Sequence, residues 1–142
     1  MKLLSMYLTL LLLTLGMVAC DKDDTPDPNV TFTATLNGAN EIPPNSSTAT
    51  GTVSLVYNTT TKVFVATITH NLSLPTGGHI HFGAAGSNGG VIFAFTNLSS
   101  PIVYTSGALN ATQESDLYAG LYYVNLHTDA FPNGEIRGQI RR

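Results

Sequence analysis

The sequence has few charged residues, and this scarcity limits the kinds of partner that the protein can recognise. Charged residues make up 11% of the 142 residues, against about 25% in an average soluble domain. The formal net charge is -3. Beyond Arg137, Arg141 and Arg142 there is no cluster of basic residues, so nucleic acid is not expected as a partner.

The chain also has a single cysteine, Cys20. An intramolecular disulfide is therefore excluded, and the folded domain must be stable without one. No serine stands in the nucleophile-elbow pattern of hydrolases, and the sequence offers no candidate catalytic residue of that type. These absences favour a binding protein over an enzyme.

Residues 1–20 are predicted to be a targeting segment outside the fold. Lys2 precedes an apolar run over residues 3–17, and the run ends in Val18-Ala19-Cys20. This ending resembles the lipobox of bacterial lipoproteins, although Met17 stands where that motif prefers leucine. The resemblance implies a lipid on Cys20; an ordinary cleaved signal or a single transmembrane helix is the alternative.

Residues 21–29 are acidic, contain two prolines and lack apolar side chains. Such a segment cannot bury surface, so we expect an acidic disordered tether. It resembles the surface-export signal of some Gram-negative lipoproteins, and a plain spacer is the alternative. The expected location is the cell envelope, with the protein lipid-anchored to a membrane, at the outer membrane or cell surface.

Residues 30–142 are predicted to form one domain. Apolar and polar residues alternate in several short segments, at 31–36, 50–57, 62–70, 79–82, 91–95, 101–104, 107–109, 121–127 and 135–140. Only residues 112–119 have a helix signal, with Gly120 placed to end it. Residues 131–134 are predicted to turn the chain before the last strand. The pattern predicts an all-β fold, an antiparallel Greek-key-like β-sandwich of about seven or eight strands with one short helix.

Two of these segments carry three of the four histidines. Successive side chains of a strand point to opposite faces. If Ile80 and Phe82 face the core, His79 and His81 face outward, and the same parity turns His127 outward in the later segment. The sequence alone does not show whether the two segments are neighbours.

Several separated motifs together resemble the CHRD domain, a family named for the extracellular protein chordin. They are Phe32-x-Ala34-x-Leu36-x-Gly38-x-x-Glu41-x-Pro43-Pro44, the strand at Gly51, His79-Ile80-His81, Gly120-x-x-Tyr123-Val124-Asn125-Leu126-His127-Thr128 and Asn133-Gly134-Glu135-Ile136-Arg137-Gly138-Gln139-Ile140. The resemblance runs over about residues 31–140. It implies an extracytoplasmic β-sandwich without a settled biochemical role for its bacterial members.

The histidine pattern is also similar, more weakly, to the copper ligands of Cu,Zn superoxide dismutases. That similarity would make His79, His81 and His127 ligands of copper, with Arg137 placed to guide an anion. The sequence lacks a recognisable zinc loop, a disulfide pair and a fourth histidine in a matching motif, since His70 lies in another context.

The residues themselves support the same candidate site. Histidines at i and i+2 of one strand lie about 6.5–7 Å apart on one face, and three neutral imidazoles suit copper, or zinc. Asn125, Glu135 and Arg137 are candidates for the surrounding shell, where Asn125 or Glu135 could hold a ring through its second nitrogen. Alternatively, these histidines only hydrogen-bond to neighbouring groups and hold a loop.

The sequence therefore supports two functions. The first is a lipid-anchored cell-envelope protein acting as a non-catalytic binding or structural module, with the membrane and an unidentified protein or small ligand as partners. The alternative is a mononuclear copper-binding protein with a three-histidine surface site and superoxide dismutase-like chemistry.

Overall fold

The structure, a computed structural model, describes residues 26–142. The targeting segment predicted for residues 1–20 and part of the predicted tether lie outside the described residues. Within residues 26–142 no helix combines the length and the apolar character needed to cross a membrane.

Eight antiparallel strands and one short α-helix make up the described part of the chain, which confirms the predicted all-β class. The elements are β1 (Asn29–Asn37), the 3₁₀ turn η1 (Gly38–Asn40), β2 (Thr50–Asn58), β3 (Phe64–His70), β4 (Pro75–Phe82), β5 (Val91–Ala94), β6 (Ile102–Thr105), α1 (Ala111–Tyr118), β7 (Tyr122–Thr128) and β8 (Phe131–Gln139).

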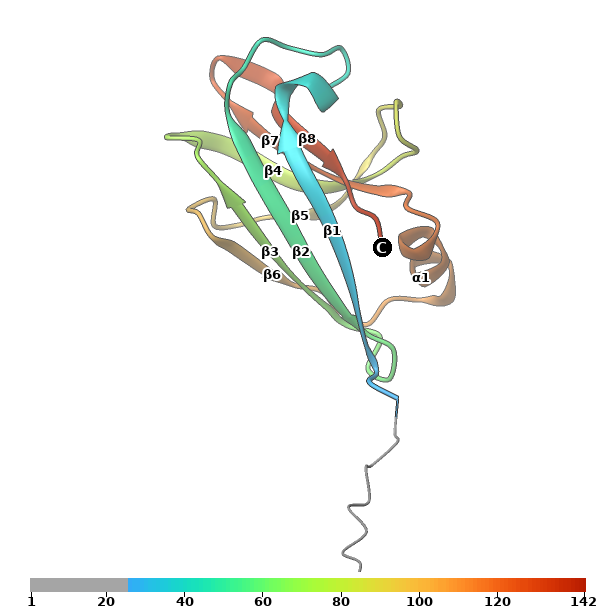
Figure 1. Cartoon of the computed structure of the whole chain (residues 1–142). Coiled ribbons are helices and arrows are strands. Elements are labelled where there is room, and N and C mark those ends of the chain that lie inside the picture. Colours follow the sequence, from blue (N-terminus) through green and yellow to red (C-terminus); the bar gives the residue numbers. More distant parts are fainter. Residues whose placement is uncertain (1–25) are drawn as a thin grey trace, which may run out of the picture.

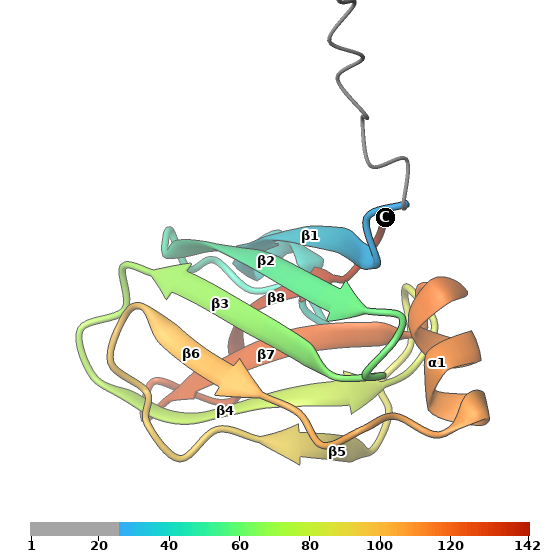
Figure 2. The same cartoon turned by 90° about the horizontal axis from the view of Figure 1, so that it is seen from below.

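The strands form one sheet in the order β5-β4-β7-β8-β1-β2-β3-β6. The sheet curls so that its two halves face each other around the core, as in a sandwich (Figures 1 and 2). At the junction of the halves β1 and β8 share one register pair, Asn37 with Arg137, and an isolated bridge joins Thr33 to Arg141. The sheet therefore curls at the junction where neighbouring strands share the fewest paired residues.

Alternation along the strands decides which side chains enter the core. In β2 the burial pattern is strictly alternating, with Val53, Leu55 and Tyr57 buried. Ile80 of β4 and Val124 of β7 are fully buried from the opposite half. Aliphatic and aromatic side chains of both halves thus form one continuous core, and its burial is the main stabilising contribution.

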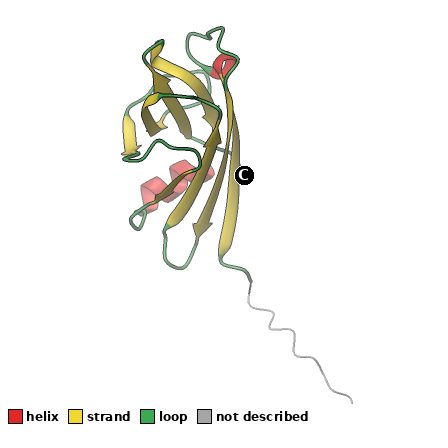
Figure 3. Ribbon diagram, turned by 90° about the vertical axis from the view of Figure 1, so that its left-hand side faces the viewer, coloured by secondary structure: helices red, strands yellow, loops and turns green. Residues whose placement is uncertain are grey.

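Helix α1 covers one end of the core (Figures 2 and 3). It begins with a capping box, in which the Asn110 side chain accepts from the Gln113 amide and the Gln113 side chain accepts from the Asn110 amide. Leu117 is fully buried, and the ring of Tyr118 packs edge-on against Phe32 at 5.4 Å. Gly120 follows with a φ of +68°, a left-handed conformation that suits glycine and ends the helix.

Two details differ from the sequence-based expectation. Phe82, expected in the core, is 43% exposed because it is the last residue of β4, where the strand leaves the core. The turn expected at residues 131–134 lies instead at 129–130, and Phe131 to Gly134 already belong to β8. Pro132 is tolerated in the strand because its position near the hairpin end needs no ladder donor.

Candidate metal centre

The two histidine-bearing strands lie side by side. Strands β4 and β7 are paired antiparallel, with Gly77 opposite His127, His79 opposite Asn125 and His81 opposite Tyr123. Their apolar partners, including Ile80 and Leu126, point into the core. The parity of the two strands therefore places all three histidines on one outer face of the sheet.

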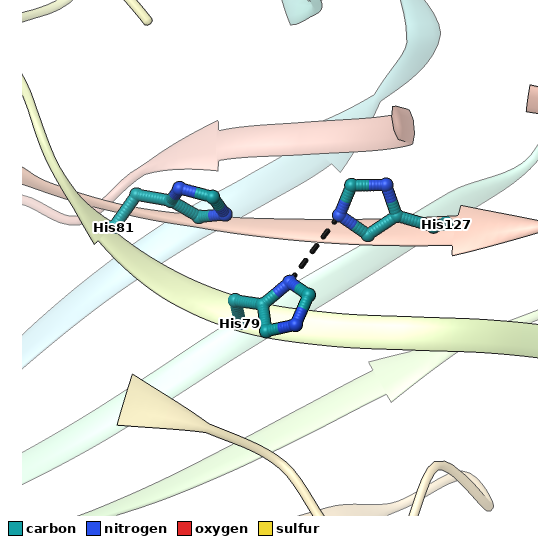
Figure 4. Close-up of side chains that lie close together, drawn as sticks. All are labelled: His79, His81 and His127. Atoms are coloured by element: carbon teal, nitrogen blue, oxygen red, sulfur yellow. Dashed lines mark hydrogen bonds between the residues drawn. The ribbon is translucent and has the colours of Figure 1, made fainter. Parts of the chain in front are cut away.

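The three imidazole rings gather at one point (Figure 4). One nitrogen from each of His79, His81 and His127 lies within 4.8 Å of the other two. His79 Nδ1 lies 3.3 Å from His127 Nε2. Two nitrogens that bind one ion at about 2.0–2.1 Å in tetrahedral geometry are themselves about 3.3–3.4 Å apart. The His79–His127 pair already has this spacing, and the His81 nitrogen lies within 4.8 Å of both.

Backbone carbonyl groups hold two of the rings. His81 Nδ1 lies 3.0 Å from the Gly89 carbonyl, and His127 Nδ1 lies 3.0 Å from the Pro132 carbonyl. In a neutral imidazole one nitrogen carries the proton and the other a lone pair. Donation from Nδ1 to these carbonyls leaves Nε2 of both rings as the lone-pair nitrogen, which is the form that binds a metal.

The Nε2 atom of His81 is buried and has no hydrogen-bond partner. A buried polar atom without a partner is unusual, because its desolvation is not offset. This nitrogen points toward the other two rings (Figure 4). A metal ion at the centre of the cluster would provide the missing partner, so the donor set fits a transition metal.

The environment of His79 and His81 favours the neutral form of these two rings. Burial lowers the pKa of His79, and the neighbouring rings of His127 and His81 lower it further. Burial also lowers the pKa of His81, with His127 and Arg137 adding to the shift, while the bond to Gly89 opposes it. Neutral imidazole is the metal-binding form, so protons compete less at these rings than at a free histidine.

The loop over residues 83–90 covers one side of the cluster. The ring of Tyr123 stacks on His81 with centroids 4.8 Å apart and an angle of 6° between the planes. On the other face of Tyr123 lies the Arg137 guanidinium, 3.5 Å from the ring centroid. Arg137 in turn holds the loop by donating to the Ser87 carbonyl at 2.6 Å. The column of His81, Tyr123 and Arg137 fixes the position of the His81 ring.

Asn125 and Glu135, which were candidates for holding a ring, form hydrogen bonds to groups outside the histidine cluster. Asn125 donates to the buried Glu41 carboxylate at 2.8 Å. Glu135 accepts from Ser47 at 2.7 Å and from the Thr128 hydroxyl. Neither hydrogen-bonds to an imidazole ring, because the carbonyls of Gly89 and Pro132 occupy the Nδ1 positions of His81 and His127.

The fourth histidine is separate from the cluster. His70 ends β3 on the other half of the sheet, where its Nε2 lies 3.0 Å from the Leu98 carbonyl and its Nδ1 accepts from the Leu72 amide. Both ring nitrogens are therefore used locally. His70 is a natural control for experiments on the other three.

The groups that orient the rings were not predicted from the sequence. Gly89 and Pro132 act through main-chain oxygens, so their side chains carry no signal of the role. The position of Tyr123 gave a weak indication of its role, because it lies two residues before Asn125 and therefore faces the same side of the strand. Glu41 is the other residue missed: burial raises its pKa to about 7, against the opposing influence of Arg137.

Comparison with known proteins agrees with this architecture. The family model of the CHRD domain matches residues 32–140, a range that contains the strands β2 to β8, most of β1 and all three clustered histidines. Neither the curated proteins nor the solved structures include a match to this chain.

Proposed function

Because this chain belongs to the CHRD domain family, we propose that it is a non-catalytic binding module that is lipid-anchored in the cell envelope and holds one transition metal ion at His79, His81 and His127. The observation that carries the metal proposal is the meeting of three imidazole nitrogens within 4.8 Å on one face of the sheet. The unpartnered Nε2 of His81 supports it.

Copper is the preferred ion. An all-imidazole site suits copper and zinc, and among the divalent first-row metals Cu²⁺ binds nitrogen sites most tightly. Three protein ligands leave at least one position open. His127 remains partly exposed, so an ion bound here is reachable from solvent, as a site that accepts and releases metal requires.

Redox chemistry of the superoxide dismutase type is the second candidate. The open position and the nearby cation of Arg137 favour it. Against it, Arg137 is only 2% exposed and lies behind the ring of Tyr123 rather than at the mouth of the site. Metal binding without catalysis is therefore the better supported function.

Competition against a chelator of known copper affinity tests the metal proposal. The full chain in a non-ionic detergent should bind one Cu²⁺ ion. His127→Ala should weaken the affinity by more than about 100-fold, since even loss of a group behind a ligand costs about 10–100-fold. His70→Gln is the matched control and should leave the affinity unchanged. Equal affinities in all three proteins would contradict the proposal.

The anchor has a separate test. The proposed lipid on Cys20 predicts that the protein sediments with membranes and that Cys20→Ala moves it to the soluble fraction or leaves an uncleaved precursor. Metabolic labelling with a fatty acid should mark the wild type and not the variant. Equal labelling of both proteins would show that Cys20 does not carry the lipid.

A further inference from the structure

A cationic cavity of about 360 Å³ lies on the outer face of the sheet. It is lined by residues of β1, β8 and the 83–90 loop, among them Arg137 and Arg141. Residues 26–142 contain four lysines and arginines, and these two make up half of them. No acidic residue lines the cavity. In a chain of net charge -3, this is an unusual concentration of positive charge.

We propose that this cavity is a binding site for a small oxyanion, held by the guanidinium groups of Arg137 and Arg141. The site is separate from the histidine cluster, and the proposal does not depend on metal binding. The ligand class is the carboxylate or phosphate group of a small molecule or of a cell-surface polymer.

Among the described residues, Arg137 is buried without a carboxylate oxygen within 4.0 Å, and the buried Glu41 carboxyl interacts with it only from a greater distance. The Arg137 side chain is 2% exposed. Its two hydrogen-bond acceptors, the Asn88 side-chain oxygen at 2.9 Å and the Ser87 carbonyl at 2.6 Å, are both neutral. Within residues 26–142 the ion pair closer than 4.0 Å is Lys62–Glu114. A buried charge is normally paired, and a bound anion would pair this one.

Arg137 also has hydrogen-bond donors that no group in the described part of the chain uses. A guanidinium has five N–H groups, and the two bonds of Arg137 to Asn88 and Ser87 leave others without an acceptor among residues 26–142. The lining amides are already committed: Gln139 donates to the carbonyls of Gly83 and Gly120, and Asn40 donates to those of Thr35 and Arg137. Recognition in this cavity therefore rests on charge-assisted bonds from arginine, which are the stronger kind.

The main chain of Arg141 is held in place by two hydrogen bonds to Thr33. Its amide donates to the Thr33 carbonyl at 2.9 Å, and its own carbonyl accepts from the Thr33 amide at 2.7 Å. The end of the chain is thereby tied to β1 at the rim of the cavity, and the exposed Arg141 side chain lines it. The buried Arg137 and the exposed Arg141 thus line the same cavity.

Guanidinium groups bind carboxylates and phosphates through two parallel bonds. Calorimetric titration of the full chain in a non-ionic detergent should compare inorganic phosphate, a phosphate monoester and a uronic acid at low ionic strength. We expect saturable 1:1 binding of at least one of them. Tightest binding of the monoester assigns a phosphorylated ligand, and tightest binding of the uronic acid assigns an acidic sugar.

The decisive variants are Arg141→Gln and Arg142→Gln. Both remove one charge from neighbouring exposed residues, but Arg142 does not line the cavity. Arg141→Gln should weaken binding about 10-fold or more, and Arg142→Gln should change it less than twofold. Arg137→Gln should abolish binding, but it also releases the 83–90 loop, so Arg141 carries the test. No saturable binding, or equal loss in the Arg141 and Arg142 variants, would overturn the proposal.

Discussion

At the scale of single residues, the chemistry of the histidine cluster depends on main-chain oxygens. The carbonyls of Gly89 and Pro132 accept hydrogen bonds from the Nδ1–H groups of His81 and His127. The lone pair on Nε2 of His127 then faces Nδ1 of His79 at 3.3 Å, and Nε2 of His81 points toward the same two rings (Figure 4). Two main-chain carbonyls, one in the 83–90 loop and one in β8, thus determine which nitrogen of His81 and of His127 is available.

The buried carboxyl group of Glu41 gives a prediction at the same scale. Burial raises its pKa to about 7 from the ordinary 4.5. Between these values the native protein holds a proton that the unfolded chain releases, so the free energy of unfolding falls as the pH rises from 4.5 to 7. Glu41→Gln keeps the oxygen that accepts from Asn125 and has no charge to bury.

The variant should therefore match the wild type near pH 4.5 and exceed its stability by about 3 kcal/mol above pH 8, because one pKa unit corresponds to about 1.4 kcal/mol. Chemical denaturation at a series of pH values measures this difference. Parallel stability profiles for the two proteins, or a wild type that gains stability between pH 5 and 8 relative to the variant, would contradict the assigned cause.

At the scale of elements, the packing of the two halves of the sheet depends on how closely strands β1 and β8 approach at their junction. A Cβ atom added to Gly138 would lie 2.4 Å from the Thr35 carbonyl oxygen and 2.7 Å from a methyl carbon of Leu36. Backbone atoms cannot move aside as a flexible side chain can. Glycine at this position therefore permits the close packing of the two strands.

Gly138→Ala should lower the free energy of unfolding by about 2–3 kcal/mol, the upper part of the range for overpacked sites. Gly107→Ala is the matched control, because an added Cβ there meets nothing within 4 Å, and it should be neutral or slightly stabilising. Thermal unfolding of both variants measures the contrast. Similar losses in the two proteins would show that the strand approach does not limit the packing.

The elements were also the level at which the sequence was most informative. The alternation in residues 50–57 predicted β2 with its buried face, because a half-exposed strand must segregate apolar and polar side chains. The turn before β8 was misplaced because Pro132 and Gly134 read as turn residues. In the structure they lie in β8, where Gly134 has a φ of +131° and is packed against Asn125 and Glu41.

The candidate site could be predicted only in part. Parity along each strand put His79 and His81 on the outer face, and likewise His127. The pairing of β4 with β7 is a property of the whole sheet, so no local pattern specifies it. The burial of Arg137 was unpredictable for the same reason, because its cover comes from the distant 83–90 loop.

At the scale of the whole molecule, the curled sheet joins the core and the site in one structure. The strands that carry the histidines also bury Ile80 and Val124 in the common core. A metal ion that bridges β4 and β7 binds the folded chain and not the unfolded one, so it should stabilise the entire domain.

Saturating Cu²⁺ should therefore raise the unfolding temperature of the full chain. An excess of 100 times the dissociation constant stabilises a native state by about 2.7 kcal/mol, and this should give an increase of several degrees in a domain of this size. His79→Ala should remove most of the increase, and His70→Gln should retain it. A copper-induced increase that is equal in both variants would place the metal elsewhere.

The most direct test of the three-histidine centre is the electron paramagnetic resonance spectrum of the full chain loaded with one equivalent of Cu²⁺. Nitrogen hyperfine structure from three imidazoles is the predicted result, with one nitrogen fewer in His81→Ala and an unchanged spectrum in His70→Gln. A spectrum without imidazole nitrogens, or one that is identical in the wild type and His81→Ala, would contradict the account.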